Sequence, residues 1–173
     1  LLSLPMLDRF EAELAQPIGL RYCGYMFLLT SERDVRAFKS NVAVQRRLGV
    51  MTEWLTPEQV RGRLPMMQVD DVLAATWHAR DGLADPNSVV QGYISGARRL
   101  GVTCLAGAEV TGIHVAGGRV RGVLTTDGEI ATPVVVNAAG PWAGQIGAMA
   151  GVEVPVVPVR RQIAVTTAIP QLP

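Results

Sequence analysis

The sequence predicts an α+β fold: a mixed or mainly antiparallel sheet with helices on one face, a three-stranded β-meander and a βα unit. Apolar runs of strand length alternate with segments whose apolar residues recur at helical spacing. Gly117-Gly118 and Asp127-Gly128 separate three short alternating segments, as tight hairpin turns do. A continuously apolar run at 134–136, followed by small residues and a proline, indicates the βα unit.

In the first half of the chain, three expected strands alternate with three expected helices. Apolar runs predict strands at 24–30, 51–55 and 73–79. Each helix begins at a side chain that can cap it, namely Ser31, Thr56 and Asp85. Pro57 and Gln59 complete the pattern of a capping box after Thr56. The helices end at Gly49, before Pro65 and at Gly101.

In the second half, the meander accounts for strands at 109–115, 119–126 and 129–132. The run at 134–136 suits a strand that is covered on both faces, as in a parallel sheet. Pro141 is expected to open a helix with Trp142, Ile146 and Met149 facing inward, and a last strand is expected at 156–166.

The composition indicates a folded domain and excludes several classes of protein. Of the 173 residues, 49% are hydrophobic and 18% are charged, which supports a core and argues against disorder. The net charge of +1 is spread over interspersed acids and bases, so no nucleic-acid partner is expected. Apolar runs stay below the ~20 residues of a membrane span, and the first residues do not resemble a signal peptide. A cytoplasmic location is therefore expected.

Neither metal binding nor disulfide chemistry is indicated. Cys23 and Cys104 are far apart and form no CxxC pair, so we expect two buried free thiols, although a disulfide between them stays open. His78 and His114 are the only histidines, and no cysteine–histidine cluster suggests a zinc site. No carboxylate lies near either histidine at a catalytic spacing, so neither is expected to be catalytic.

The segment 134–144 is where the residues best support ligand chemistry. Small residues after the strand allow a ligand to approach the backbone closely. The N-terminus of the following helix would present unpaired N–H groups to an anion such as a diphosphate. An ordinary strand-to-helix connection with small residues for packing is the alternative interpretation.

Several segments, in order and spacing, resemble the D-amino-acid oxidase/sarcosine oxidase superfamily. They are DGLADP at 81–86, EVTGI at 109–113 with GGRV at 117–120, NAAGPWA at 137–143 and PVRRQ at 158–162. The chain is most similar in these motifs to sarcosine oxidase β subunits, glycine oxidase and dimethylglycine dehydrogenase. The resemblance covers essentially the whole chain and implies a flavoprotein that uses FAD.

The resemblance also implies domains and site residues. Residues 1–80 would belong to a substrate domain, 81–151 to the flavin-binding domain, and 152–173 to a strand that returns to the substrate domain. The backbone of Val110 would pair with the flavin's adenine. A turn beside the bound dinucleotide would contain Ala138, Ala139, Gly140 and Trp142. Arg160, Arg161 and Tyr25 are the candidates on the substrate side, and strand alternation allows at most one of the two arginines to face substrate.

Parts of the family pattern are missing from the sequence. No two of the 18 glycines are two positions apart, so the G-x-G-x-x-G turn is absent. The family's C-terminal glycine-rich loop is absent as well. We therefore expect an internal fragment that neither binds FAD nor turns over substrate alone, with the catalytic residues elsewhere in a longer protein. Its flavin-facing surface would favour self-association or a partner subunit.

The implied reaction is oxidation of a C–N bond, with hydride transfer to FAD. A small amine or amino acid such as sarcosine, dimethylglycine, glycine or proline would be the substrate. Two alternatives stay open at this stage. One is a related FAD enzyme that acts on an alcohol such as glycerol 3-phosphate, and the other is a non-enzymatic α+β binding module.

Overall fold

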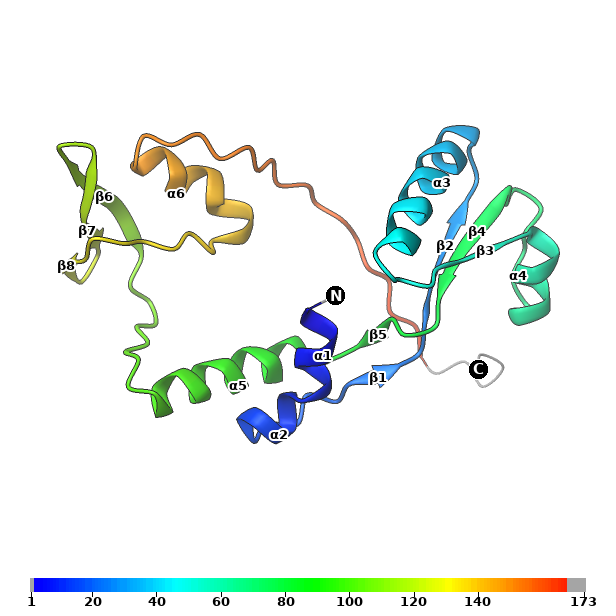
Figure 1. Cartoon of the computed structure of the whole chain (residues 1–173), viewed down its shortest axis with the longest axis horizontal. Coiled ribbons are helices and arrows are strands. Elements are labelled where there is room, and N and C mark those ends of the chain that lie inside the picture. The colour runs from blue at the N-terminus through cyan, green and yellow to red at the C-terminus, as the bar shows by residue number, and fades with distance from the viewer. Residues whose placement is uncertain (1, 168–173) are drawn as a thin grey trace. The chain divides into compact units, whose positions relative to one another are not determined.

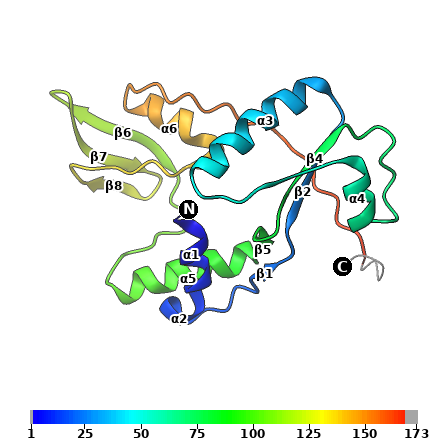
Figure 2. The same ribbon diagram turned by 45° about the vertical axis from the view of Figure 1, so that its right-hand side comes forward.

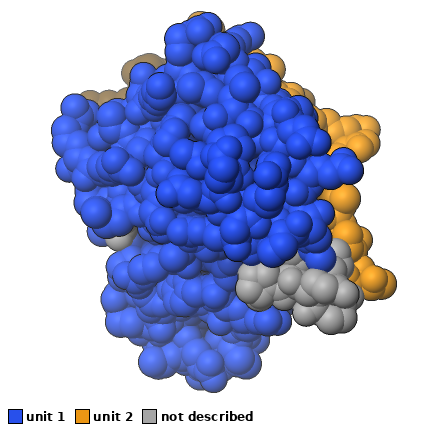
Figure 3. Space-filling model, turned by 90° about the vertical axis from the view of Figure 1, so that its right-hand side faces the viewer, with its two compact units in different colours: residues 1–103, 168–173 blue, residues 104–167 orange. Residues whose placement is uncertain are grey.

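The computed structural model describes residues 2–167 of the chain (Figure 1). These residues form two compact units, one extending to Thr103 and the other spanning Cys104–Thr167 (Figure 3). Each unit has its own antiparallel strands. The α+β class and the antiparallel pairing that the sequence predicts are therefore confirmed.

The first unit is built on a three-stranded antiparallel sheet (Figures 1 and 2). Its strands, in spatial order, are β2 (Tyr25–Leu29), β4 (Ala74–His78) and β3 (Glu53–Leu55). All three lie within the predicted strand segments. Because β4 is the central strand, it has a hydrogen-bonded neighbour on each side and is the most enclosed strand of the sheet.

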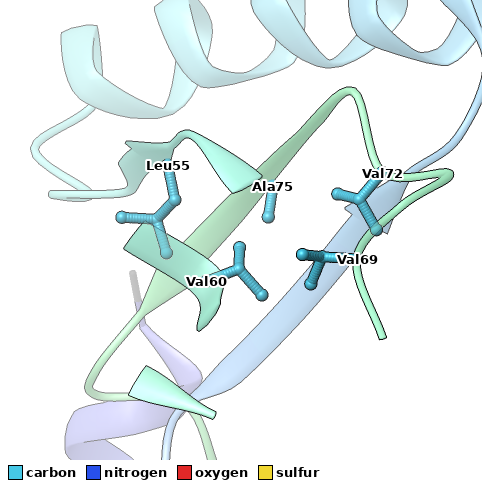
Figure 4. Packing of buried hydrophobic residues seen from close by; sticks show 5 residues of the cluster. All are labelled: Leu55, Val60, Val69, Val72 and Ala75. Atoms are coloured by element: carbon cyan, nitrogen blue, oxygen red, sulfur yellow. The ribbon is translucent and has the colours of Figure 1, made fainter. Parts of the chain in front are cut away.

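Successive residues of β4 face opposite sides of the sheet, so each side has its own packing. Ala75 faces α4 (Pro57–Arg63), where the side chain of Val60 is fully buried. Thr76 is 3% exposed and faces α3 (Glu32–Arg47). Helices thus lie against both faces of the sheet, whereas the sequence indicated one face. The buried cluster on the α4 side consists of Leu55, Val60, Val69, Val72 and Ala75 (Figure 4).

The three predicted helix caps are confirmed. Ser31 caps α3, and Thr56 forms a capping box at α4. At α5 (Pro86–Arg99) the Asp85 carboxylate accepts a hydrogen bond from the Ser88 N–H at 2.8 Å. Hydrogen bonds from the hydroxyl and the N–H of Ser88 hold the pKa of Asp85 below its usual range.

Two short helices at the start of the chain, α1 (Ser3–Asp8) and α2 (Phe10–Leu14), are not predicted by the sequence pattern. Phe10 is 1% exposed, and its ring meets that of Tyr93 edge-on, with centroids 5.0 Å apart. Gly92 on α5 faces Phe10 directly, and a Cβ at that position would overlap the ring. Close approach of α2 and α5 therefore depends on a glycine. A two-stranded ladder of β1 (Arg21–Tyr22) with β5 (Gly82–Leu83) completes this unit.

The second unit begins with the predicted meander. Its strands β6 (Val110–Ala116), β7 (Arg119–Thr125) and β8 (Gly128–Ala131) are antiparallel neighbours in that order. The register shifts between Val110 and Gly112, at the start of β6. The chain then runs to a 3₁₀ turn at Gly140–Trp142 and the helix α6 (Ala143–Met149), which contacts β6.

Two strands predicted in the second unit are wrong. Residues 134–136 and 156–166 have no ladder partner in the described part of the chain. Val136 is 85% exposed and Ile163 is 90% exposed, so neither segment is covered by a neighbouring layer. A strand requires hydrogen bonds from a neighbouring strand, and an apolar run cannot show that its neighbour is present.

Other details also differ from the sequence expectations. Trp142 is 62% exposed rather than inward-facing, while Ile146 and Met149 are half-buried. Cys23 is exposed and Cys104 is half-buried; both are free, so the expected free thiols are confirmed but their burial is not. Within residues 2–167, no helix is long and apolar enough to cross a bilayer, and no cluster of ligands for a metal ion occurs.

The Asp85 cap should make α5 sensitive to acid. Because the folded-state pKa of Asp85 is lowered, its stabilisation is complete above the unfolded carboxyl pKa and is lost as pH falls through the folded-state value. Asp85→Asn keeps a capping acceptor that does not titrate, so it should flatten this part of the acid unfolding profile. Thermal unfolding followed by circular dichroism across the acid range checks this. Asp71→Asn, at an exposed turn, is the control and should leave the profile unchanged.

Two glycine-to-alanine substitutions in helices should have opposite effects. Gly92→Ala should destabilise the chain by about 1–3 kcal/mol, because the new methyl group must displace the buried Phe10 ring. Gly62→Ala, on α4 with open space around it, should be neutral or stabilise by about 0.5–1 kcal/mol. Urea unfolding measures both. Equal effects of the two substitutions would contradict the proposed packing of α2 on α5.

Candidate functional site

The open edge of the β-meander carries Val110. Among the described residues, β6 pairs only with β7, so its other edge has no strand neighbour. The carbonyl of Glu109 points toward β7, where it accepts a hydrogen bond from the N–H of Thr126 at 3.0 Å. Backbone groups of successive strand residues point to opposite edges. We infer that the N–H and C=O of Val110 face the open edge, as pairing with a planar ligand requires.

The turn before α6 is fixed by one asparagine. The Asn137 amide donates to the carbonyl of Ala143 at 2.9 Å, and its Oδ1 accepts from the N–H of Ala139 at 3.2 Å. Gly140 has a φ of +53°, which disfavours a side chain there. The indole of Trp142 is exposed at the end of the turn. The predicted cofactor residues Ala138, Ala139, Gly140 and Trp142 thus lie on one short, braced loop.

The second unit offers only part of a dinucleotide site. The open edge at Val110 fits an adenine, and the small-residue turn leaves room for a ligand beside the backbone. The seven-residue helix α6 is too short to be a strong anion site, and the sequence has no G-x-G-x-x-G turn. The residues present therefore fit the adenine end of FAD and not its diphosphate.

The first unit contains a pocket between α3 and the face of the sheet that bears Thr76. Its volume is ≈ 220 Å³. Tyr25, the predicted substrate-side residue, lines it, as Phe27 does. Polar groups are contributed by both elements and by the turn after β4. The full lining is Tyr25, Phe27, Phe38, Asn41, Val42, Gln45, Thr52, Thr76, His78 and Asp81.

His78 has a carboxylate partner, contrary to the expectation from sequence. Its Nδ1 lies 2.9 Å from Oδ1 of Asp81, across the turn that follows β4. The Asp81 N–H donates to the His78 carbonyl at 3.3 Å, and the Asp81 carbonyl accepts from the N–H of Gly24 at 2.8 Å. Asp81 follows His78 by three residues in the sequence. This spacing could have predicted the pair, because the turn after β4 brings the two side chains together. His114 is likewise paired, with Glu129 at 3.1 Å.

Gly24 explains why this turn is held in place. Its φ is +71°, and a Cβ there would overlap the ring of Trp77. The ring therefore packs directly on the Gly24 backbone, next to the hydrogen bond from Gly24 to Asp81. Elsewhere in the same unit, the Tyr22 hydroxyl donates a hydrogen bond to the Asp8 carboxylate. This hydrogen bond raises the pKa of Tyr22.

Arg160 and Arg161 are exposed residues of the second unit. The segment that holds them has no strand pairing, so the expected alternation onto opposite sheet faces is wrong for the described residues. Their role on the substrate side stays a prediction.

The sequence of the chain is matched among known proteins. The profile of the DAO family, described as FAD dependent oxidoreductase, matches residues 1–173. The chain belongs to this family. It is 31% identical to mitochondrial dimethylglycine dehydrogenase of Rattus norvegicus over 170 residues, which are 98% of this chain and 20% of that protein. It is also 31% identical to sarcosine oxidase subunit beta of Arthrobacter sp, over 89% of this chain and 39% of that subunit.

A solved structure supports the same assignment. L-proline dehydrogenase from P. horikoshii superimposes with a TM-score of 0.70 at 34% identity. The match covers 86% of this chain and 39% of that structure. This DAO-family chain thus spans about a fifth of the dimethylglycine dehydrogenase and about two fifths of the other two proteins.

Proposed function

We propose that this chain is part of a flavin-dependent oxidoreductase that oxidises the C–N bond of a small amine or amino acid. The family match over the whole chain carries the proposal. Several relatives are named for amine or amino-acid substrates, namely dimethylglycine, sarcosine and proline. These names favour the amine class over the glycerol 3-phosphate type.

The second unit would hold the adenine end of FAD. The Val110 backbone would supply one donor and one acceptor to the adenine. The loop of Ala138, Ala139, Gly140 and Trp142 would lie beside the dinucleotide. When bound, FAD would supply the electron acceptor for the oxidation. The diphosphate turn must come from residues outside this chain, so we do not expect the chain alone to bind FAD or to turn over substrate.

We assign roles to the segments of the chain from the family resemblance. Residues 1–80 would serve the substrate and 81–151 the flavin, with 152–173 returning to the substrate domain. One relative is a subunit of sarcosine oxidase, which favours a partner subunit for the complete protein. The dehydrogenase relatives are mitochondrial, so the cytoplasmic location stays a prediction.

The experiment that tests the function is anaerobic titration of the full-length protein, expressed from its complete gene. We expect a flavin absorption spectrum that bleaches with sarcosine, dimethylglycine or proline and not with glycerol 3-phosphate. A colourless protein would reject a flavin enzyme and favour a binding module. Bleaching by the alcohol alone would reject the amine class.

The backbone role of Val110 allows a matched pair of substitutions. Val110→Pro removes the N–H from the open edge of β6, where the sheet tolerates a proline, and should weaken FAD binding about tenfold through loss of one hydrogen bond. Val110→Ala keeps the N–H and should bind FAD nearly as well as the unchanged protein. Equilibrium binding of FAD to the apo form of the full-length protein measures both. Equal loss in the two variants would show that the side chain, not the backbone, is important.

A further inference from the structure

The helix α3 carries a local excess of positive charge that the net charge of +1 conceals. Its 16 residues include five cations and two acids. The acids, Glu32 and Asp34, both lie in the first turn, where they stabilise the N-terminus of the helix. Within residues 2–167, none of the five cations of α3 forms an ion pair, whereas several arginines elsewhere in the first unit do. The charge of this helix is therefore not compensated by its neighbours in the described part of the chain.

Four of these cations share one flank of α3. Residues three, four or seven positions apart lie on the same side of a helix. Ala43 is at the centre of the flank, because each of the four cations is at one of these spacings from it. We call the four the basic flank: Arg36, Lys39, Arg46 and Arg47, all of them exposed. At the rise of an α-helix, the flank is roughly 16 Å long.

A groove of ≈ 230 Å³ opens beside the basic flank. It is lined by Lys39, Val42, Ala43 and Arg46 of α3 and by Trp54 of β3. The Nζ of Lys39 lies 5.9 Å from the centroid of the Trp54 ring. Nε of Arg46 donates a hydrogen bond to the Thr52 carbonyl at 2.9 Å. These contacts hold two cations beside an indole ring and two small apolar side chains.

The groove has no acidic side chain in its described lining. Trp54 is the ladder partner of Thr76 and shares its side of the sheet, which faces α3. Glu53, the residue before Trp54, faces the opposite side. There Arg63 of α4 binds the Glu53 carboxylate at 2.7 Å. The nearest acid of β3 is thus engaged on the other face and does not neutralise the groove.

The size and chemistry of the groove favour a protein segment as its occupant. Its volume is below the roughly 300–1,000 Å³ of sites for drug-sized ligands, so it suits one inserted side chain. Tryptophan and arginine are the residues that carry much of the binding energy in protein interfaces. A second helix laid along α3 repeats its residues at the same spacing, so its carboxylates meet the cations of the basic flank in register. The net charge of +1 does not favour a nucleic acid.

We infer that the basic flank and its groove are a docking surface for an acidic, amphipathic helix of a partner protein. An apolar side chain of that helix enters the groove over Trp54, and carboxylates on either side of it pair with Lys39 and Arg46. Arg36 and Arg47 extend the charged surface to both ends of the contact, which speeds association. The inference concerns assembly, so it holds or fails independently of the flavin reaction and of the substrate.

A synthetic acidic helix is the probe for the charged part of this surface. The probe is a fluorescein-labelled peptide of about 20 residues, long enough to be helical in water, with a row of glutamates and one central leucine. Fluorescence anisotropy during titration with the full-length protein should show saturable binding that weakens as salt is added. Lys39→Glu should weaken binding about tenfold, because it places like charges opposite one another. The control Arg61→Glu makes the same change on α4, which packs on the other face of the sheet, and should bind as the unchanged protein does.

A second pair of variants tests the groove without any change of charge. Ala43→Leu fills the groove and should weaken binding of the probe about tenfold, because the leucine of the probe loses its place. Ala37→Leu adds the same side chain at an exposed position of α3 outside the groove lining and should leave binding unchanged. Leucine and alanine are both good helix formers, so both variants should fold, which circular dichroism checks.

Three results would overturn the inference. One is unchanged binding of the probe in both Lys39→Glu and Ala43→Leu. Another is an equal loss in Lys39→Glu and Arg61→Glu, which would be an effect of net charge alone. The third is tighter binding of oligothymidylate or of phosphatidylglycerol vesicles than of the probe, lost in Lys39→Glu, which would assign the basic flank to a nucleic acid or a membrane.

Discussion

The first unit depends on the central position of β4 in its sheet. This strand has hydrogen-bonded neighbours on both edges, and its small residues Ala74, Ala75 and Thr76 are buried. Small side chains allow α4 to approach one face and α3 the other, so both layers are positioned by one strand. At its end, β4 presents Trp77 to Gly24 and His78 to the pocket. Core packing and the polar turn are therefore consequences of the same strand.

The second unit is organised differently, because the groups that we propose for cofactor binding are mainly backbone atoms. β7 occupies the centre of the meander and leaves one edge of β6 open, where Val110 lies. The turn at 137–143 is held by the side chain of Asn137 and by the left-handed conformation of Gly140. Backbone recognition tolerates many side chains, so such positions have weak residue signals. This explains why Val110 could be singled out only through resemblance to a family.

The family assignment concerns the cofactor and leaves the substrate open. The match over residues 1–173 establishes the DAO family and its FAD-dependent chemistry. It does not specify a substrate, since the relatives are named for dimethylglycine, sarcosine and proline.

The sequence alone determined the features that depend on local chemistry. Side chains at Ser31, Thr56 and Asp85 cap their helices, and glycines at the hairpin turns set the meander, because these effects act over a few residues. Tertiary structure decided what depends on distant partners. The runs at 134–136 and 156–166 are apolar enough for strands, yet the described residues give them no neighbour. The burial of Phe10 against Tyr93 likewise requires a contact between residues that are distant in sequence.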